Sequence, residues 1–269
     1  MPALIEPIVT MYKCPDLLSE TVSQAKMGEP IDIIEDKSRT DFYLIKTLWD
    51  NYTGFVQKKS VDKEAGTWSP EPSIITASLT NLVYSSPKVQ AQIIARLPLG
   101  IKIKLLGSNK DHQPSWLNVM LCNGLVGFIQ VGDICFPDRF KFNNLSSLRQ
   151  SLVSWANKFE GATTYLWGGT SSFGIDCSGF VQHIYRLHDL PLERDASQMG
   201  QGKYLKNIKR EDVLPGDLIF FKDYGHVGMA ISHFSFIHAT THLKPVVQVS
   251  EIDSSNWLEN TIQYSRYKF

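Results

Sequence analysis

The first half of the sequence repeats itself, and this repeat restricts the fold more than any other feature. Residues 27–36, MGEPIDIIED, are echoed by residues 98–107, PLGIKIKLLG. Residues 42–57 are echoed by residues 116–130, and the two copies end in GFVQ and GFIQ. Each copy contains short alternating apolar runs separated by Gly, Asn and Asp, which is typical of short strands. The repeat therefore predicts two small β-barrels in series.

The second half changes to helical periodicity and then to strands. The apolar positions of a first helix, which is expected to end near Gly161, are Leu148, Leu152, Trp155 and Phe159. The inner positions of a second helix are Phe180, Val181, Ile184, Tyr185 and Leu187. Strands are expected over residues 217–221, 226–231, 234–239 and 246–252. Helices followed by an antiparallel sheet indicate an α+β domain.

We therefore expect three domains. Residues 1–70 and 71–140 form the two all-β barrels, and residues 141–269 form the α+β domain. Lys+Arg and Asp+Glu balance at 27 each in the 269 residues, so no global charge points to nucleic acid. No apolar run reaches the roughly 18 residues of a membrane span.

The four cysteines are scattered, and none has zinc-ligand spacing, so neither a disulfide framework nor a metal is expected. No organic cofactor is expected either. A signal peptide has a basic region followed by a long apolar run, and the N-terminal residues do not show this pattern. We therefore expect a cytoplasmic protein; a periplasmic or secreted one remains the alternative if a leader has been removed.

Cys177 lies in GGTSSFGIDCSGFVQHIY, residues 168–185, between a glycine-rich turn and an apolar-periodic segment. Asp176 is a good N-cap residue, so Cys177 is expected in the first turn of the second helix. Backbone N–H groups at a helix start carry partial positive charge and favour the thiolate, which makes this cysteine a candidate nucleophile. The alternative is a small buried thiol. That role is expected for the other cysteines: Cys14, Cys122 and Cys135.

Two histidines, His226 and His238, lie on strands that are expected to form a hairpin. A thiol nucleophile needs an imidazole to take its proton, and that base needs an orienting partner. In a hairpin that turns near residue 232 or 233, the numbers of two paired residues add up to about 464 or 466. Because 226 and 238 add up to 464, the first of these two registers places the histidines directly opposite each other. Opposed Cβ atoms lie about 4.5–5.5 Å apart. His226 is then the base and His238 fixes its tautomer; the alternative is two unrelated surface histidines. His188 is expected on a solvated face.

Four ordered motifs resemble those of the NlpC-type cell-wall cysteine peptidases, papain-like enzymes that cut peptidoglycan stem peptides. The motifs are YLWGGTSSFGIDCSGF, LPLERDAS, LPGDLIFF and HVGMAI followed by FIHAT, and they run from about Trp155 to the C-terminus. The resemblance implies that Cys177 is the nucleophile, that His226 is the base and that His238 orients it. It also implies that Tyr165 helps the N–H of the cysteine to stabilise the oxyanion.

The domain order resembles the γ-D-glutamyl-L-diamino acid endopeptidases, in which two bacterial SH3-like domains precede the peptidase. The implied substrate is a short murein peptide with a free N-terminal L-Ala, supplied as a peptidoglycan stem peptide or a recycled muropeptide. The residues implied to hold the amine are Glu29, Tyr52 and Asp195. The residues implied to contact the D-glutamyl portion are Asp176 and Ser178. The alternative for Glu29 and Tyr52 is the solvated rim of a barrel.

Two positions depart from the family pattern. Ala196 stands where relatives often carry Ser or Thr, and Met199 stands where a Gln is expected. Two other functions also remain open. The chain could be a non-catalytic cell-wall-binding protein, or it could form the same thioester as an amidase or acyltransferase.

Overall fold

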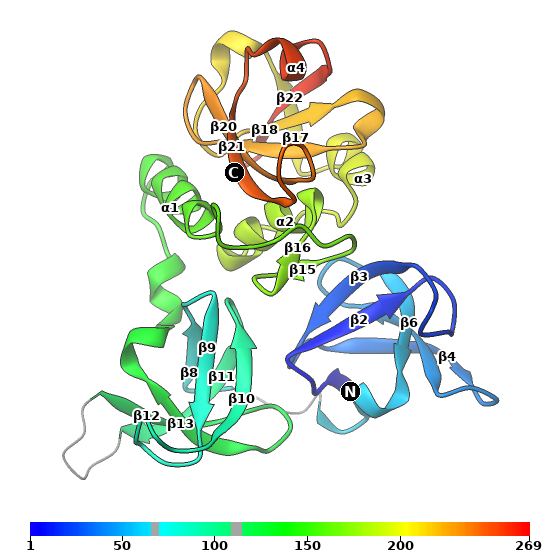
Figure 1. Cartoon of the computed structure of the whole chain (residues 1–269), viewed down its shortest axis with the longest axis vertical. Coiled ribbons are helices and arrows are strands. Elements are labelled where there is room, and N and C mark those ends of the chain that lie inside the picture. The colour runs from blue at the N-terminus through cyan, green and yellow to red at the C-terminus, as the bar shows by residue number, and fades with distance from the viewer. Residues whose placement is uncertain (66–69, 109–114) are drawn as a thin grey trace. The chain divides into compact units, whose positions relative to one another are not determined.

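The computed structural model of the 269-residue chain describes residues 1–65, 70–108 and 115–269 (Figure 1). The chain forms two compact units, Met1–Arg139 and Phe140–Phe269. In its described residues the first unit is all β apart from short 3-10 turns, and the second unit combines helices with an antiparallel sheet. Within the described residues, no helix is long and apolar enough to cross a membrane.

The first unit contains two principal antiparallel sheets. The five-stranded sheet has the order β3-β2-β6-β5-β4. Its strands are β2 (Ile8–Tyr12), β3 (Thr21–Lys26), β4 (Ile31–Lys37), β5 (Phe42–Thr47) and β6 (Thr53–Gln57). The seven-stranded sheet has the order β10-β9-β13-β12-β11-β8-β14. Its strands are β8 (Ser73–Thr76), β9 (Thr80–Tyr84), β10 (Ile93–Pro98), β11 (Lys102–Ser108), β12 (Trp116–Met120), β13 (Val126–Gln130) and β14 (Ile134–Cys135). A small third sheet pairs β1 (Ala3–Leu4) with β7 (Val61–Asp62).

The sequence repeat is also a structural repeat. Strands β3-β2-β6-β5-β4 correspond in order to β10-β9-β13-β12-β11. In the first copy Phe42 pairs with Gln57, and in the second Trp116 pairs with Gln130. Each sheet buries a separate apolar cluster, because alternate side chains along its strands point inward.

The second unit is built on the antiparallel sheet β17-β22-β18-β19-β20-β21. Its strands are β17 (Leu205–Ile208), β18 (Leu218–Phe221), β19 (Val227–Ala230), β20 (Ser235–Thr240), β21 (Val246–Glu251) and β22 (Thr261–Tyr267). Its helices are α1 (Leu145–Asn157), α2 (Cys177–Leu187), α3 (Ala196–Gln201) and α4 (Ser255–Leu258). A two-stranded ribbon, β15 (Thr170–Ser171) with β16 (Gly174–Ile175), precedes α2.

Helix α2 is the central helix of this unit and contacts β19 and β20 (Figure 1). Every residue of α2 except Arg186 is buried, so the expected inner face is confirmed and the rest of the helix is covered as well. Gly179 allows the close approach of the ribbon, since a Cβ there would lie 2.2 Å from the carbonyl oxygen of Gly169. The prediction that His188 lies on a solvated face is wrong. Its ring is buried, stacks on Phe142 and lies 2.9 Å from the hydroxyl of Ser151.

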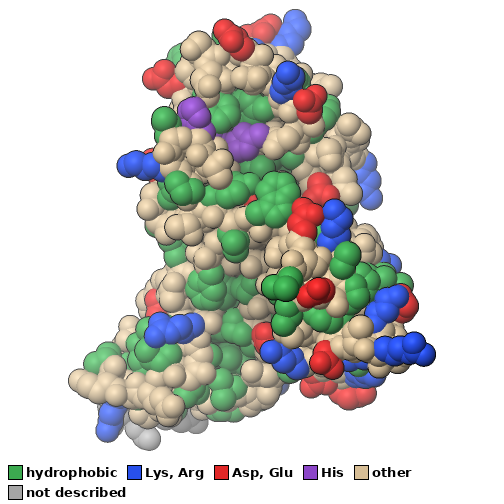
Figure 2. Space-filling view, turned by 45° about the vertical axis from the view of Figure 1, so that its right-hand side comes forward, with side chains coloured by type: hydrophobic (Ala, Val, Ile, Leu, Met, Phe, Trp, Pro, Cys, Tyr) green, Lys and Arg blue, Asp and Glu red, His purple; other side chains and the backbone are tan. Residues whose placement is uncertain are grey.

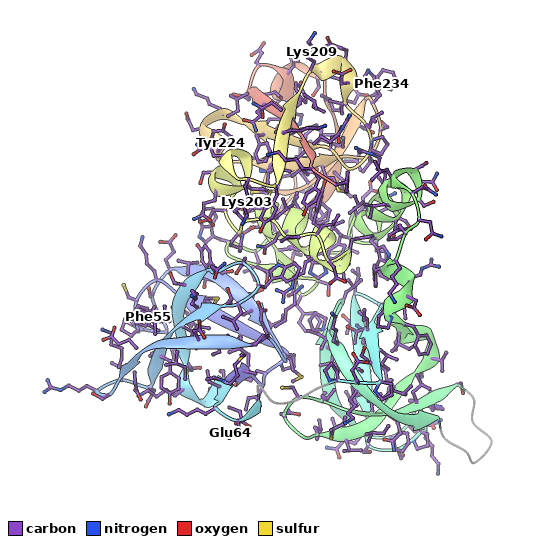
Figure 3. The ribbon with its side chains drawn as sticks, turned by 180° about the vertical axis from the view of Figure 1, so that it is seen from behind. Phe55, Glu64, Lys203, Lys209, Tyr224 and Phe234 are labelled. Atoms are coloured by element: carbon purple, nitrogen blue, oxygen red, sulfur yellow. The ribbon has the colours of Figure 1, made fainter. Side chains whose placement is uncertain are left out.

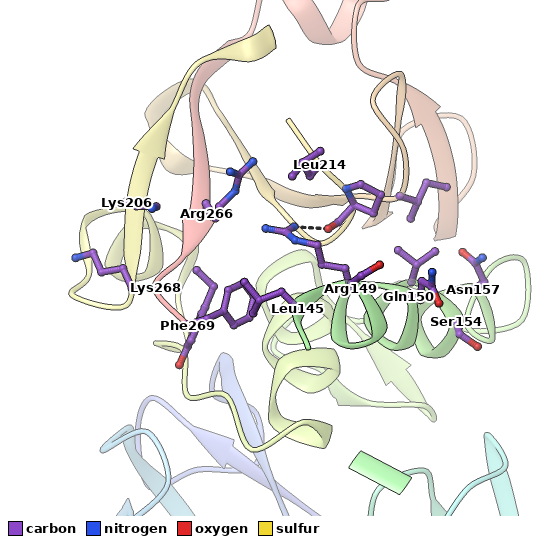
Figure 4. A pocket seen from close by; sticks show the side chains of 15 residues that line it. Leu145, Arg149, Gln150, Ser154, Asn157, Lys206, Leu214, Arg266, Lys268 and Phe269 are labelled. Atoms are coloured by element: carbon purple, nitrogen blue, oxygen red, sulfur yellow. Dashed lines mark hydrogen bonds between the residues drawn. The ribbon is translucent and has the colours of Figure 1, made fainter. Parts of the chain in front are cut away.

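Helix α1 is joined to the sheet through one buried carboxylate. Asp217 is 1% exposed and forms ion pairs with Arg149 of α1 at 3.0 Å and with Arg266 of β22 at 2.7 Å. Arg149 also donates to the carbonyl oxygen of Pro215 (Figure 4). A groove of about 1120 Å³ lies beside these arginines, and none of the predicted site residues lines it.

Candidate active site

Cys177 is the first residue of α2, as predicted. Asp176 is the N-cap and accepts a hydrogen bond from the N–H of Gly179 at 2.7 Å. The sulfur is buried, and the backbone N–H groups of Val227 and Ser178 are directed at it. Val227 directly follows His226, so this contact brings the sulfur to the strand that carries the predicted base.

His226 and His238 form a hydrogen-bonded pair. His226 Nε2 lies 2.7 Å from His238 Nδ1, and His238 Nε2 lies 3.1 Å from the hydroxyl of Ser250. With Nε2 engaged in this bond, His226 retains Nδ1 for the exchange of a proton with a thiol. Neutral rings satisfy both bonds when Nε2–H of His226 donates to His238 and Nε2–H of His238 donates to Ser250.

The register that sequence analysis used to bring these histidines together is wrong. In the structure Met229 pairs with Ile237 and Ala230 with Phe236, so paired numbers sum to 466. His226 is therefore displaced by two positions from the place opposite His238. The rings still meet because diagonal neighbours on one face of a sheet are within reach of long side chains. Phe234, at the tip of this hairpin, is 69% exposed (Figure 3).

Gly228 makes the diagonal contact possible. A Cβ at this position would lie 2.4 Å from the ring of Phe236 and 3.3 Å from the Cβ of His238. The space that a side chain would occupy is thus filled by Phe236, whose ring packs 4.5 Å from that of His238.

Gly228→Ala is expected to displace the histidine pair. We expect the unfolding free energy of the second unit to fall by about 1–3 kcal/mol, because the added methyl group overpacks a filled site. Peptidase activity should fall by more than about tenfold, since a misplaced catalytic group loses rate steeply. Gly225→Ala is the matched control, because its Cβ would meet only the carbonyl oxygen of Lys222 at 3.5 Å. Equal activities of the two variants in a peptide-cleavage assay would contradict this explanation.

Burial sets the protonation states of Cys177 and His226. It raises the pKa of Cys177 to about 12, and the charge of Asp176 adds to that rise. Burial also lowers the pKa of His226 to about 4, against an opposing contribution from Asp176. The expectation of a resting thiolate is therefore corrected: desolvation outweighs the helix start, and the free site holds a neutral thiol and a neutral imidazole.

Tyr165 lies near the sulfur as well. Burial, followed by the charge of Cys177, raises the pKa of Tyr165 to about 12. The phenol is therefore protonated at neutral pH and can donate a hydrogen bond. Its backbone is fixed by a hydrogen bond to the carbonyl oxygen of Pro245 at 2.9 Å and a bridge to Ile175.

A buried ion pair adjoins Cys177. Arg194 is 2% exposed, and its Nη2 lies 2.6 Å from Asp176 Oδ2. Its Nη1 donates to Asp176 Oδ1 at 3.1 Å and to the hydroxyl of Ser178 at 2.9 Å. Arg194 thus connects the two residues that flank Cys177. Arg194 is not among the predicted site residues, although it stands beside Asp195 in the ERDAS motif.

The other predicted binding residues lie in different surroundings. Asp195 is the half-buried N-cap residue of α3, and its neighbours Ala196 and Met199 are buried. Glu29 and Tyr52 belong to the first unit. Glu29 is 4% exposed and accepts from the N–H of Lys26 at 3.1 Å, so the alternative of a solvated rim is wrong for this residue. Tyr52 is half-buried and packs against the core of the first sheet.

The buried histidines predict a protein that is labile to acid. Burial lowers the folded-state pKa of His188 to about 4, of His226 to about 4 and of His238 to about 2. Because the unfolded state takes up these protons first, this stability is complete above pH 6.5 and is lost as the pH falls toward 4. Between pH 7.5 and 5 we expect a loss of about 2 kcal/mol per histidine.

Urea denaturation of the second unit at pH 7.5, 6 and 5 measures this loss. His188→Gln should reduce the pH dependence by about one proton. An unfolding free energy that is the same at pH 7.5 and 5 would rule out neutral buried imidazoles.

A thiol at a helix start, an imidazole pair and a phenol together define a site of the papain-like cysteine peptidase type. Histidine side chains reach the surface of the second unit beside hydrophobic ones (Figure 2). The comparison with known proteins agrees with this class. A sequence model of the NlpC/P60 family matches residues 162–266. The probable endopeptidase NlpC of Escherichia coli is 37% identical over 128 residues, which are 45% of this chain and 77% of that protein. The chain belongs to the NlpC/P60 family and is a cysteine peptidase.

Other relatives match along most of the chain. Dipeptidyl-peptidase 6 of Lysinibacillus sphaericus is 28% identical over 88% of this chain and 86% of its own length. The gamma-D-glutamyl-L-lysine dipeptidyl-peptidase of Bacillus cereus is 24% identical over 91% and 74%, respectively. A crystal structure of an NlpC/P60 family protein from Bacillus cereus shares the fold, with a TM-score of 0.83 over 99% of each chain at 20% identity. The relatives support a peptidase that acts on the cell wall.

Proposed function

We propose that the protein hydrolyses the γ-D-glutamyl–diamino acid bond of short murein peptides that carry a free N-terminal L-Ala. The observation that carries the chemistry is the 2.7 Å contact between His226 and His238 beside the buried sulfur of Cys177. The substrate class is supported by the relative named gamma-D-glutamyl-L-lysine dipeptidyl-peptidase, which matches 91% of the chain.

In the proposed acylation step, Nδ1 of His226 takes the thiol proton of Cys177 while the sulfur attacks the γ-carbonyl carbon. The resulting oxyanion is held by the N–H of Cys177 and the phenol of Tyr165. His226 then gives its proton to the departing amine, and the C–N bond breaks to leave a thioester. His238 keeps Nε2–H of His226 oriented throughout.

In deacylation the same ring takes a proton from water, and the hydroxide attacks the thioester carbonyl. The C–S bond breaks, the proton returns to the sulfur, and an L-Ala-D-Glu dipeptide leaves. Each step begins and ends with neutral groups, which suits a buried site where an isolated charge is costly.

Substrate recognition is proposed from the family resemblance. Asp176 and Ser178 are proposed to contact the D-glutamyl portion, and Glu29, Tyr52 and Asp195 the free amine. The repeated sheets of the first unit are proposed to be two SH3-like domains, a proposal supported by their matching strand orders. A carboxylate that binds the free amine would weaken the binding of N-capped peptides, because it would be left without a partner when such a peptide binds.

Mass spectrometry of the products tests the specificity. L-Ala-γ-D-Glu-diaminopimelate should yield L-Ala-D-Glu, whereas its N-acetylated form should be cleaved at least about 100-fold more slowly. Equal cleavage of the two peptides would refute amine recognition. Transfer of the acyl group to an added amine in preference to water would instead identify an acyltransferase. Binding without cleavage would indicate a wall-binding protein.

A further inference from the structure

One aromatic side chain contacts both rings of the histidine pair. Trp257, on α4, stacks on His226 with a centroid distance of 5.6 Å and an interplanar angle of 27°. It meets His238 edge to face at 4.8 Å and 89°. Trp257 is not among the predicted site residues, because it lies more than 18 residues beyond His238 on a separate element.

The backbone that carries the indole ring is fixed within its own segment. The backbone N–H of Trp257 donates to the carbonyl oxygen of Ser254 at 3.0 Å, and the hydroxyl of Thr261 donates to the backbone carbonyl oxygen of Trp257 at 2.9 Å. The ring also packs at 5.1 Å from Phe221 and at 5.5 Å from Phe236. Both phenylalanines belong to the buried core cluster beneath the site. Trp257 is therefore a rigid part of the wall against which the histidines lie.

The stacked geometry has an electrostatic consequence. A cation within about 6 Å of an indole centroid is attracted to the negative face of the ring, and Trp is the strongest of the aromatic residues in this respect. His226 is neutral in the free site and becomes an imidazolium when it takes a proton from the nucleophile. An interaction that strengthens only when this charge forms accelerates the reaction.

We propose that Trp257 is a positioning residue for the proposed peptidase reaction: it holds His226 against His238, and its ring face stabilises the imidazolium that forms during attack. This inference rests on the proposed function. The nearby titratable groups include Asp176 and Cys177 at the start of α2, Tyr165 before it, and His242 after β20. The ring of His242 also packs against the indole, with a centroid distance of 5.3 Å.

Steady-state kinetics of four variants test this role. Trp257→Leu removes the aromatic face, and we expect kcat/KM to fall about tenfold. Trp257→Phe keeps an aromatic face and should stay within about threefold of the wild type. Leu258→Ala is the matched control, because that neighbouring side chain is 47% exposed. Cys177→Ala reports on the proposed function itself.

Proton NMR of ¹⁵N-histidine-labelled protein supplies a readout that folding stability alone does not move. The hydrogen-bonded Nε2–H of His226 should give a downfield signal in the wild type and in Trp257→Phe, and should weaken or shift in Trp257→Leu. If Trp257→Leu keeps both the signal and wild-type kcat/KM while Cys177→Ala is inactive, the inference fails and the peptidase proposal stands. Equal losses in the Leu and Phe variants would also overturn it. Undiminished cleavage by Cys177→Ala would instead remove the proposed function.

Discussion

Cys177→Ala is expected to lower kcat/KM for L-Ala-γ-D-Glu-diaminopimelate by roughly 10⁴- to 10⁶-fold. Losses of this size are typical when the nucleophile of a covalent mechanism is removed, because what remains is binding and oxyanion stabilisation. The sulfur of Cys177 is the thiol that lies against the backbone of Val227, next to His226. No other group in the proposed mechanism can form the thioester.

The control for this substitution is Cys14→Ala. Cys14 lies in the first unit and is exposed, so the prediction that it is a small buried thiol is wrong. The control variant should retain wild-type activity. Product formation measured by mass spectrometry separates the two variants without a reporter group. If Cys177→Ala kept more than about a tenth of the wild-type rate, a nucleophile elsewhere would be required.

Arg194→Met is expected to destabilise the second unit by about 3–5 kcal/mol. The guanidinium makes contacts of 2.6 and 3.1 Å with Asp176, and both side chains are almost completely buried. Removing the arginine leaves a buried carboxylate without its counter-charge, which costs more than the ion pair itself contributes. The start of α2 should loosen with it, so activity should fall together with stability.

A double-mutant cycle isolates this effect. Asp176→Asn combined with Arg194→Met should recover part of the lost unfolding free energy, because the asparagine needs no counter-charge. Arg210→Met is the control at a more exposed ion pair. Arg210, whose side chain is 21% exposed, lies 2.5 Å from Asp253, whose side chain is 54% exposed, and its loss should cost about 1 kcal/mol or less. Urea denaturation measures the unfolding free energy of each variant. If Arg194→Met and Arg210→Met lost similar amounts of it, the buried ion pair would matter no more for stability than the more exposed one.

The elements with strong local signals were predictable. Asp176 as an N-cap, the apolar periodicity of α2 and the alternation in β20 each depend on neighbours along the chain, and the structure confirms these elements. The repeat likewise predicted two similar sets of short strands in the first unit, and the two sheets have matching strand orders. Strands β17 and β22 were missed because their pairing joins segments almost 60 residues apart.

The proximity of His226 and His238 was predictable from the sequence, but the geometry of their contact was not. A two-residue change of register was compatible with the same alternation, so the sequence could not distinguish direct from diagonal opposition of His226 and His238. The burial of Cys177 was also missed, since it depends on β19 packing against α2. Arg194 and Trp257 reach the site from other segments, and no spacing rule connects them to it.

The most direct test of the central claim is the alkylation rate of Cys177 by iodoacetamide, resolved by peptide mass spectrometry, in the wild type and in His226→Ala. Exposed Cys14 is the internal reference in the same sample. If the imidazole takes the proton of a neutral buried thiol, the rate at Cys177 relative to Cys14 should fall at least about 100-fold in the variant at pH 7. Equal relative rates in the two proteins would contradict the proposal that His226 activates Cys177.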